Sequence, residues 1–70
     1  MMTDYKQIIS KADYMLAQGK LGVYSPDEIE AHLRGMIAVL LCDPATAATI
    51  CASQVFHRIT VFKKEQEMSA

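Results

Sequence analysis

Apolar residues recur every three or four positions in three stretches of this chain, a spacing typical of amphipathic α-helices. The first stretch predicts a helix over residues 4–18, with Thr3 as a candidate N-cap. Gly19 directly after it predicts a left-handed stop at the end of the helix. The inward face of this helix is expected to contain Tyr5, Ile8, Ile9, Ala12, Met15 and Leu16.

The second predicted helix, over residues 26–42, has a strongly marked start. Ser25 is placed as the N-cap, and Pro26 takes the first helical position, where its missing N–H carries no cost. Glu28 lies three residues after Ser25, which is the spacing of a capping box. The apolar stripe that follows consists of Ile29, Leu33, Met36 and Leu40.

The last turns of this second helix, "MIAVLLC", are apolar on nearly all sides. Helices of that kind are usually covered on more than one face, so we expect the second helix to lie in the centre of the domain. Its back carries three small residues where charged ones would be expected: Ala31, Gly35 and Ala38. Small residues let another backbone approach closely, although Gly35 costs about 1 kcal/mol of helix propensity relative to alanine.

A third helix is predicted over residues 44–63, because Asp43-Pro44 repeats the cap-then-proline order of Ser25-Pro26. Residues 55–62 are rich in β-branched and aromatic side chains and could form a strand. We favour a helix, since the chain offers no partner strand, and we expect the tail from about residue 64 to be frayed. The predicted inward stripe is Ala48, Cys51, Ala52, Val55, Ile59 and Phe62. The pattern as a whole predicts one compact all-α domain of three helices.

The composition indicates that not all apolar side chains can be buried in one core. The chain has 70 residues, of which 51% are hydrophobic and 21% charged, more apolar material than so small a core can bury. Some of it is therefore expected on the surface or in an interface. The net charge is −1 and evenly spread, which makes nucleic acid an unlikely partner because there is no basic field for phosphates.

The same residues lead us to expect a soluble, cytoplasmic protein. The longest apolar run, residues 36–42, is much shorter than the roughly 20 residues of a membrane-spanning helix. The first residues, "MMTDYKQ", lack the basic and apolar regions of a signal peptide. Two cysteines without such a signal indicate reduced thiols. Small helical chains of this kind are frequent among accessory proteins of phages and mobile elements, so we keep that origin as an expectation.

Catalytic and metal chemistry find little support in the sequence. His32, Cys42, Cys51 and His57 are the candidate zinc ligands, but their spacings lack the paired motifs of structural zinc sites. No glycine-rich phosphate loop or organised nucleophile is recognisable. We therefore expect a protein that is not an enzyme and that has no metal and no cofactor.

A DNA-binding regulator with a helix-turn-helix arrangement is the alternative hypothesis. Its contacts would come from the third helix: Gln54, His57, Arg58, Lys63 and Lys64. Against it, the tight turn falls earlier, at Asp43-Pro44, and the helix that follows begins with small uncharged residues, "ATAATICA".

The favoured hypothesis is a regulatory protein that acts by binding a larger, unidentified protein. Opposite the core stripe of the third helix, a seam repeats at i, i+4, i+7 and i+11: Ile50, Gln54, His57 and Val61. The small residues Ala31, Gly35 and Ala38 form a second packing surface. Tyr14 lies outside the core stripe of the first helix, and tyrosine is favoured as an interface anchor. We expect a homodimer or higher oligomer, with the third-helix seam as the leading candidate for its interface.

Overall fold

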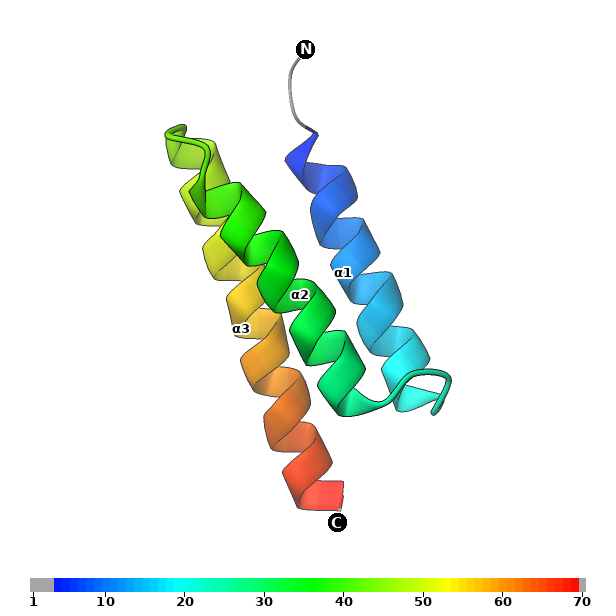
Figure 1. Cartoon of the computed structure of the whole chain (residues 1–70). Coiled ribbons are helices and arrows are strands. Elements are labelled where there is room, and N and C mark those ends of the chain that lie inside the picture. Colours follow the sequence, from blue (N-terminus) through cyan, green and yellow to red (C-terminus); the bar gives the residue numbers. More distant parts are fainter. Residues whose placement is uncertain (1–3, 70) are drawn as a thin grey trace.

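The computed structural model describes residues 4–69, which form three helices: α1 (Tyr5–Lys20), α2 (Pro26–Leu41) and α3 (Thr46–Ser69). The helices run down, up and down, so that α1 and α3 point in the same direction (Figure 1). All regular secondary structure within residues 4–69 is helical, which confirms the predicted compact three-helix domain and makes 55–62 a helix. In the described part of the chain, no helix is long and apolar enough to cross a membrane.

The predicted start of α2 is confirmed. The Ser25 hydroxyl accepts a hydrogen bond of 3.2 Å from the backbone N–H of Glu28, and Pro26 occupies the first turn. The N-cap of α1 is Asp4, whose carboxylate accepts hydrogen bonds from the next turn at 3.1 and 3.3 Å. Thr3, the cap proposed from the sequence, lies outside the described residues.

The end of α1 differs from the prediction. The helix continues through Gly19 to Lys20, and the left-handed residue is Gly22, with φ 81°. Gly19 instead permits close packing: a Cβ there would collide with Cδ1 of Ile29 and lie 3.1 Å from Cζ of Phe62. The prediction that Gly19 stops the helix is therefore wrong. This position is a glycine where side chains of α2 and α3 leave no room for a Cβ.

The turn between α2 and α3 also corrects the predicted helix start. The third helix begins at Thr46, two residues later than expected, so Asp43-Pro44 does not act as its cap. Asp43 Oδ1 accepts a hydrogen bond from the N–H of Ala45 at 3.0 Å, while Oδ2 accepts one from the Tyr5 hydroxyl at 3.0 Å. The carboxylate therefore shapes the turn and ties it to α1. At its other end, α3 continues to Ser69, beyond the predicted end at 63.

The core consists of the three stripes predicted from the sequence. Every residue of those stripes is buried or packs against the core, which confirms the assignment of the inward faces. More than half of the buried residues belong to α3. The buried residues are Ala12, Leu16, Ile29, Leu33, Leu40, Ala48, Cys51, Ala52, Val55, Ile59 and Phe62.

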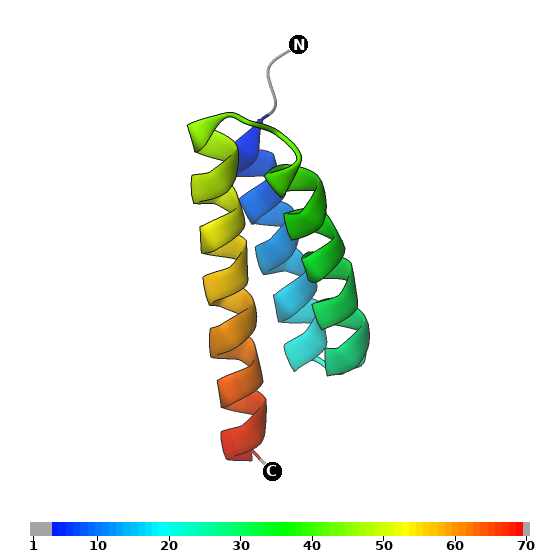
Figure 2. The same ribbon diagram turned by 60° about the vertical axis from the view of Figure 1, so that its left-hand side comes forward.

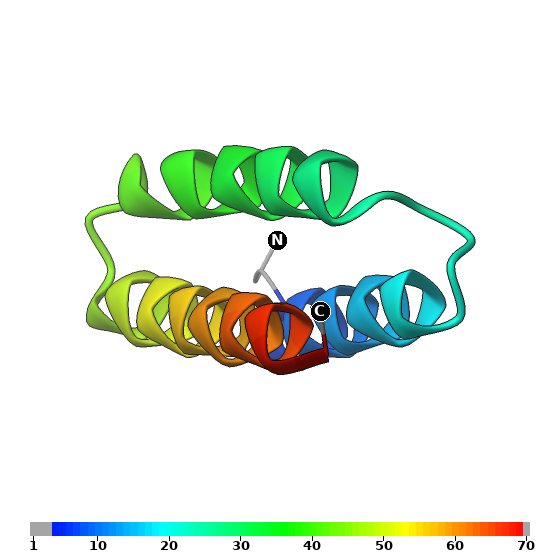
Figure 3. The same cartoon turned by 90° about the horizontal axis from the view of Figure 1, so that it is seen from below.

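The expectation that α2 is the central, covered helix is wrong. Val39 and Leu41, in its apolar last turns, are 73% and 59% exposed. Seen from below, α2 forms one side of the bundle, opposite α1 and α3 (Figure 3). The apolar composition of these turns therefore reflects exposed apolar surface. The longest helix is α3, and its C-terminal turns extend past the ends of the other two helices (Figure 2).

Candidate functional site

The predicted seam lies on the outer side of α3, beside α1. Ile50 and Val61 are 54% and 41% exposed, and Gln54 and His57 between them are exposed as well. Two hollows separate this seam from α1, an upper one of about 460 Å³ beside Ile50 and a lower one of about 430 Å³ beside Val61. We call this surface, with its seam and its two hollows, the α1–α3 face.

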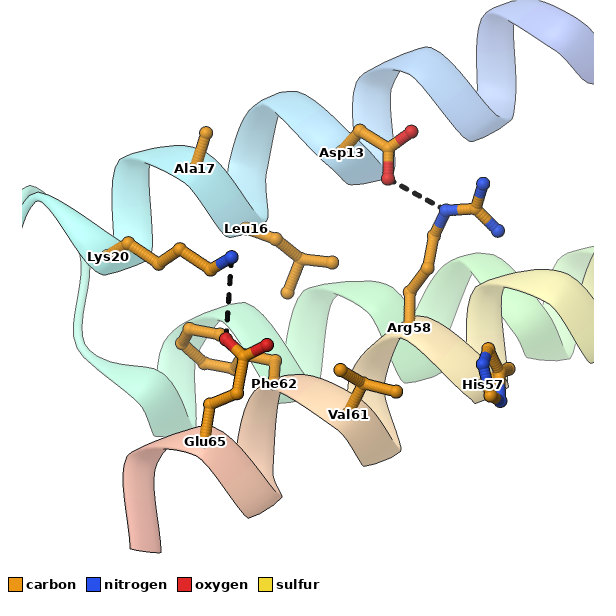
Figure 4. Close-up of a pocket in the computed structure, with 9 residues that line it drawn as sticks. All are labelled: Asp13, Leu16, Ala17, Lys20, His57, Arg58, Val61, Phe62 and Glu65. Carbon is orange, nitrogen blue, oxygen red and sulfur yellow. Dashed lines mark hydrogen bonds and ion pairs between the residues drawn. The ribbon is translucent and has the colours of Figure 1, made fainter. Parts of the chain in front are cut away.

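The lower hollow has an apolar floor and a charged rim (Figure 4). Leu16 and Phe62 are buried side chains that form part of its lining. Across it, Arg58 Nε lies 2.7 Å from an Asp13 carboxylate oxygen. A second ion pair spans it nearer the end of the helices, with 3.4 Å between Lys20 Nζ and Glu65 Oε2. These two ion pairs of the lower hollow both link α1 to α3.

A different face contains Tyr14 and two of the three small residues. Ala31 and Gly35 line a cleft of about 780 Å³ between α1 and α2, which we call the α1–α2 cleft. Tyr14, 62% exposed, lines a smaller hollow that continues between the same helices and also includes Tyr24. Ala38 is exposed elsewhere on α2. The structure therefore divides the predicted residues between two faces and does not place Tyr14 beside the α3 seam.

The α1–α2 cleft contains apolar residues that sequence reasoning missed. Val39 lines it and is 73% exposed, and Met36, assigned to the core stripe, is only partly buried there. The apolar run "MIAVLLC" contains these residues, but apolar side chains on all sides of a helix predict a covered helix and not an open cleft. The remaining lining is Tyr5, Ile8, Lys11, His32, Leu40 and Asp43.

Gly35 differs from Gly19 in its surroundings. Within the described residues, no side chain or neighbouring helix comes within 4 Å of a Cβ built at Gly35. A glycine in a helix interior costs about 1 kcal/mol relative to alanine. Packing inside this chain gives no reason for that cost.

Two of the basic residues proposed for DNA contact, Arg58 and Lys63, already interact with carboxylates. Arg58 pairs with Asp13, and Lys63 Nζ lies 3.2 Å from Glu30. Glu30 also accepts a hydrogen bond of 2.9 Å from Arg34, which lies one turn further along α2. The hydrogen bonds from Arg34 and then Lys63 lower the pKa of the Glu30 carboxyl. Phosphate groups would have to compete with these pairs.

The two cysteines occupy different environments. Cys51 is buried, and this burial raises the pKa of its thiol, which points at the carbonyl oxygen of Tyr5 at 3.9 Å. Such a thiol is a poor nucleophile because the thiolate is the reactive form. Cys42 is exposed and donates a hydrogen bond of 3.3 Å to the carbonyl of Ala38. Among the described residues, no group of three or more potential ligands is placed to hold a metal ion.

Comparisons with protein-family models, with curated proteins and with solved structures find no match for this chain. The chemistry of the α1–α3 face and of the α1–α2 cleft is therefore what indicates a function.

Proposed function

We propose that this chain is a small, non-catalytic regulatory protein that binds a helix of a larger protein in its α1–α2 cleft. The observation that carries the proposal is the cleft itself, about 780 Å³ with exposed apolar residues on its α2 wall. Grooves of this kind accept the apolar face of an amphipathic helix. The partner segment would therefore carry apolar residues at i, i+3, i+4 and i+7.

The small residues of α2 support a helical partner in particular. Ala31 and Gly35 stand on the open wall of the cleft, and a Cβ at Gly35 would meet empty space. A partner backbone can come close at such positions, which gives the helix-weakening glycine a use that contacts within the chain do not. Tyr14 and Tyr24 at the lower end add two exposed aromatic rings as candidate anchors.

Val39→Asp tests this proposal, with Leu41→Asp as its matched control. Both are exposed aliphatic residues near the end of the same helix, but only Val39 lines the cleft. Tagged wild-type and variant chains would be used to capture partners from the native host, followed by mass spectrometry and titration with the purified partner. We expect Val39→Asp to weaken binding by roughly a hundredfold, because it buries an unpaired charge, and Leu41→Asp to preserve it.

Two outcomes would contradict the proposal while circular dichroism shows folded variants. If Val39→Asp binds the partner as tightly as the wild type does, the cleft is not the binding site. If Val39→Asp and Leu41→Asp lose the same amount of affinity, the added charge acts through something other than the cleft. For the DNA alternative, binding to a mixed-sequence duplex would be titrated at several salt concentrations. Affinity that falls steeply as salt rises would support that alternative, since it reports released counterions. We expect no such binding, because the Arg58 and Lys63 side chains are already paired with the carboxylates of Asp13 and Glu30.

A further inference from the structure

We infer that the partner helix carries a carboxylate in the middle of its apolar face, and that Lys11 and His32 of this chain bind it. The inference rests on the proposed function, because it concerns the same binding site, and it adds the charge by which this site selects its partner. Three observations support it: the position of Lys11 and His32, the lack of an ion pair for Lys11 among residues 4–69, and the carboxylates on either side of the two residues.

Lys11 and His32 lie in the middle of the space between α1 and α2. Both residues line the α1–α2 cleft, and both also line the smaller hollow that continues from it. We call the cleft and this hollow together the α1–α2 groove. Toward the α2–α3 turn the groove wall contains the exposed Val39, and toward the α1–α2 loop it contains Tyr14 and Tyr24. A helix lying along the groove therefore has apolar contacts on both sides of the residue that faces Lys11 and His32.

The shape of the groove favours a helix that runs along α1 and α2. The described lining of the cleft comes from α1, α2 and the turn after α2, with no residue of α3. The helices α1 and α2 run in opposite directions (Figure 1), so the groove follows the length of both. A helix seated there takes the place of the fourth helix in a four-helix bundle. Val39 is seven residues from His32, about 10 Å along α2, so a partner residue two turns from the carboxylate faces Val39.

The Lys11 ammonium forms no ion pair with any residue of the described chain. Four other basic side chains of residues 4–69 do form ion pairs: Lys20, Arg34, Arg58 and Lys63. Of the basic side chains in this range without an ion pair, Lys11 is the one that lines the groove. A purely apolar helix would cover its ammonium without a partner, which costs binding free energy. A carboxylate instead accepts hydrogen bonds from the ammonium and from the N–H of His32, which imidazole presents in either protonation state.

Acidic residues on either side confine this carboxylate to the middle of the groove. Asp43 lines the cleft at the α2–α3 turn, and Glu28 lines the smaller hollow, one turn before His32 on α2. The Asp43 carboxylate already accepts hydrogen bonds from the Tyr5 hydroxyl and a backbone N–H. A partner carboxylate near either end would face one of these like charges, which opposes binding. The charge order of the groove therefore selects an acidic residue at one position of the partner helix.

Selection from displayed helices tests the inference. The probe is a phage library of amphipathic helices about five turns long, with apolar residues at i−7, i−4, i+4 and i+7. Position i, in the middle of the apolar face, varies among Glu, Gln and Lys. We expect selection on the wild type to enrich Glu roughly tenfold over Gln, the size of a hydrogen bond to a charged group, and to deplete Lys. Selection on Lys11→Glu should reverse this preference in favour of Lys.

Lys6→Glu is the matched control, because Lys6 has the same charge on the same helix but lines the α1–α3 face. It should keep the wild-type preference for Glu, with circular dichroism showing that each variant is folded. Equal enrichment of Glu and Gln would overturn this inference and leave the proposed function standing, as would equal effects of Lys6→Glu and Lys11→Glu. Helices that still bind Val39→Asp at full strength would lie outside the cleft, which overturns both. If no helix is enriched, this inference fails, and partner capture by Val39→Asp and Leu41→Asp still decides the proposed function.

Discussion

Gly19 and Gly35 both lie inside helices, and the structure gives them different reasons to be glycine. At Gly19 a side chain would collide with the fully buried Ile29 and approach the ring of Phe62. At Gly35 the described residues leave open space around the missing Cβ. The first glycine permits close packing in the core, whereas contacts among residues 4–69 do not explain the second.

We therefore expect opposite effects when each is replaced by alanine. Gly35→Ala should raise the free energy of unfolding by about 1 kcal/mol, the ordinary gain in helix propensity. Gly19→Ala gains the same propensity but overpacks the core, and we expect a net loss of about 1 kcal/mol. Urea unfolding followed by circular dichroism measures both changes. A destabilising Gly35→Ala would show that Gly35 is packed within the monomer.

Partner capture by Gly35→Ala provides a further measurement on the same protein. If a partner backbone approaches at this position, the added methyl group should weaken binding even though the chain becomes more stable. Gain of stability with unchanged capture would place the partner elsewhere.

The helices themselves were predictable wherever local contacts determine them. The start of α2 depends on Ser25, Pro26 and the N–H of Glu28, all close in sequence, and it was correctly predicted. The inward stripes were likewise correct, because helical periodicity determines which residues share a face. The start of α3 was not, because Asp43 is engaged by Tyr5, a residue 38 positions away. No local pattern reveals a contact of that range.

The Tyr5–Asp43 hydrogen bond, which holds the α2–α3 turn against α1, leads to a prediction for alkaline pH. The bond raises the pKa of the Tyr5 hydroxyl above its ordinary value of 10.0, with burial and the charge of Asp43 acting in the same direction. A group whose pKa is raised by folding stabilises the protein fully below the unfolded value and loses that contribution as the pH rises through the folded value. Wild type should therefore lose stability more steeply above pH 10.0 than Tyr5→Phe.

Urea unfolding at a series of alkaline pH values measures this difference. Tyr14→Phe, the same substitution at an exposed tyrosine, is the matched control. Parallel profiles for wild type and Tyr5→Phe would show that the hydrogen bond does not contribute to stability in solution.

At the scale of the whole molecule, the sequence could not predict how the faces are distributed. A helical pattern determines which residues lie together on one helix, but the rotation of each helix within the bundle depends on packing. The sequence therefore offers Tyr14 and the seam at Ile50 together as interface candidates. In the structure, Tyr14 lines a hollow between α1 and α2, and Ile50 lines one between α1 and α3. For the same reason the sequence predicts that Val39 is covered, whereas it is 73% exposed.

The stability of so small a domain should depend on its own concentration. A core of this size rarely supplies more than roughly 3–5 kcal/mol, so an added interface is a large part of the total. If folded chains associate through the α1–α3 face, mass action stabilises the folded state as concentration rises. We expect the thermal midpoint of the wild type to increase steadily as the protein concentration is raised a hundredfold. Each tenfold increase in concentration favours the associated, folded state by up to about 1.4 kcal/mol. Ile50→Asp should show a lower midpoint that does not change with concentration, while Leu41→Asp should follow the wild type. A wild-type midpoint independent of concentration would mean that the core alone stabilises the fold.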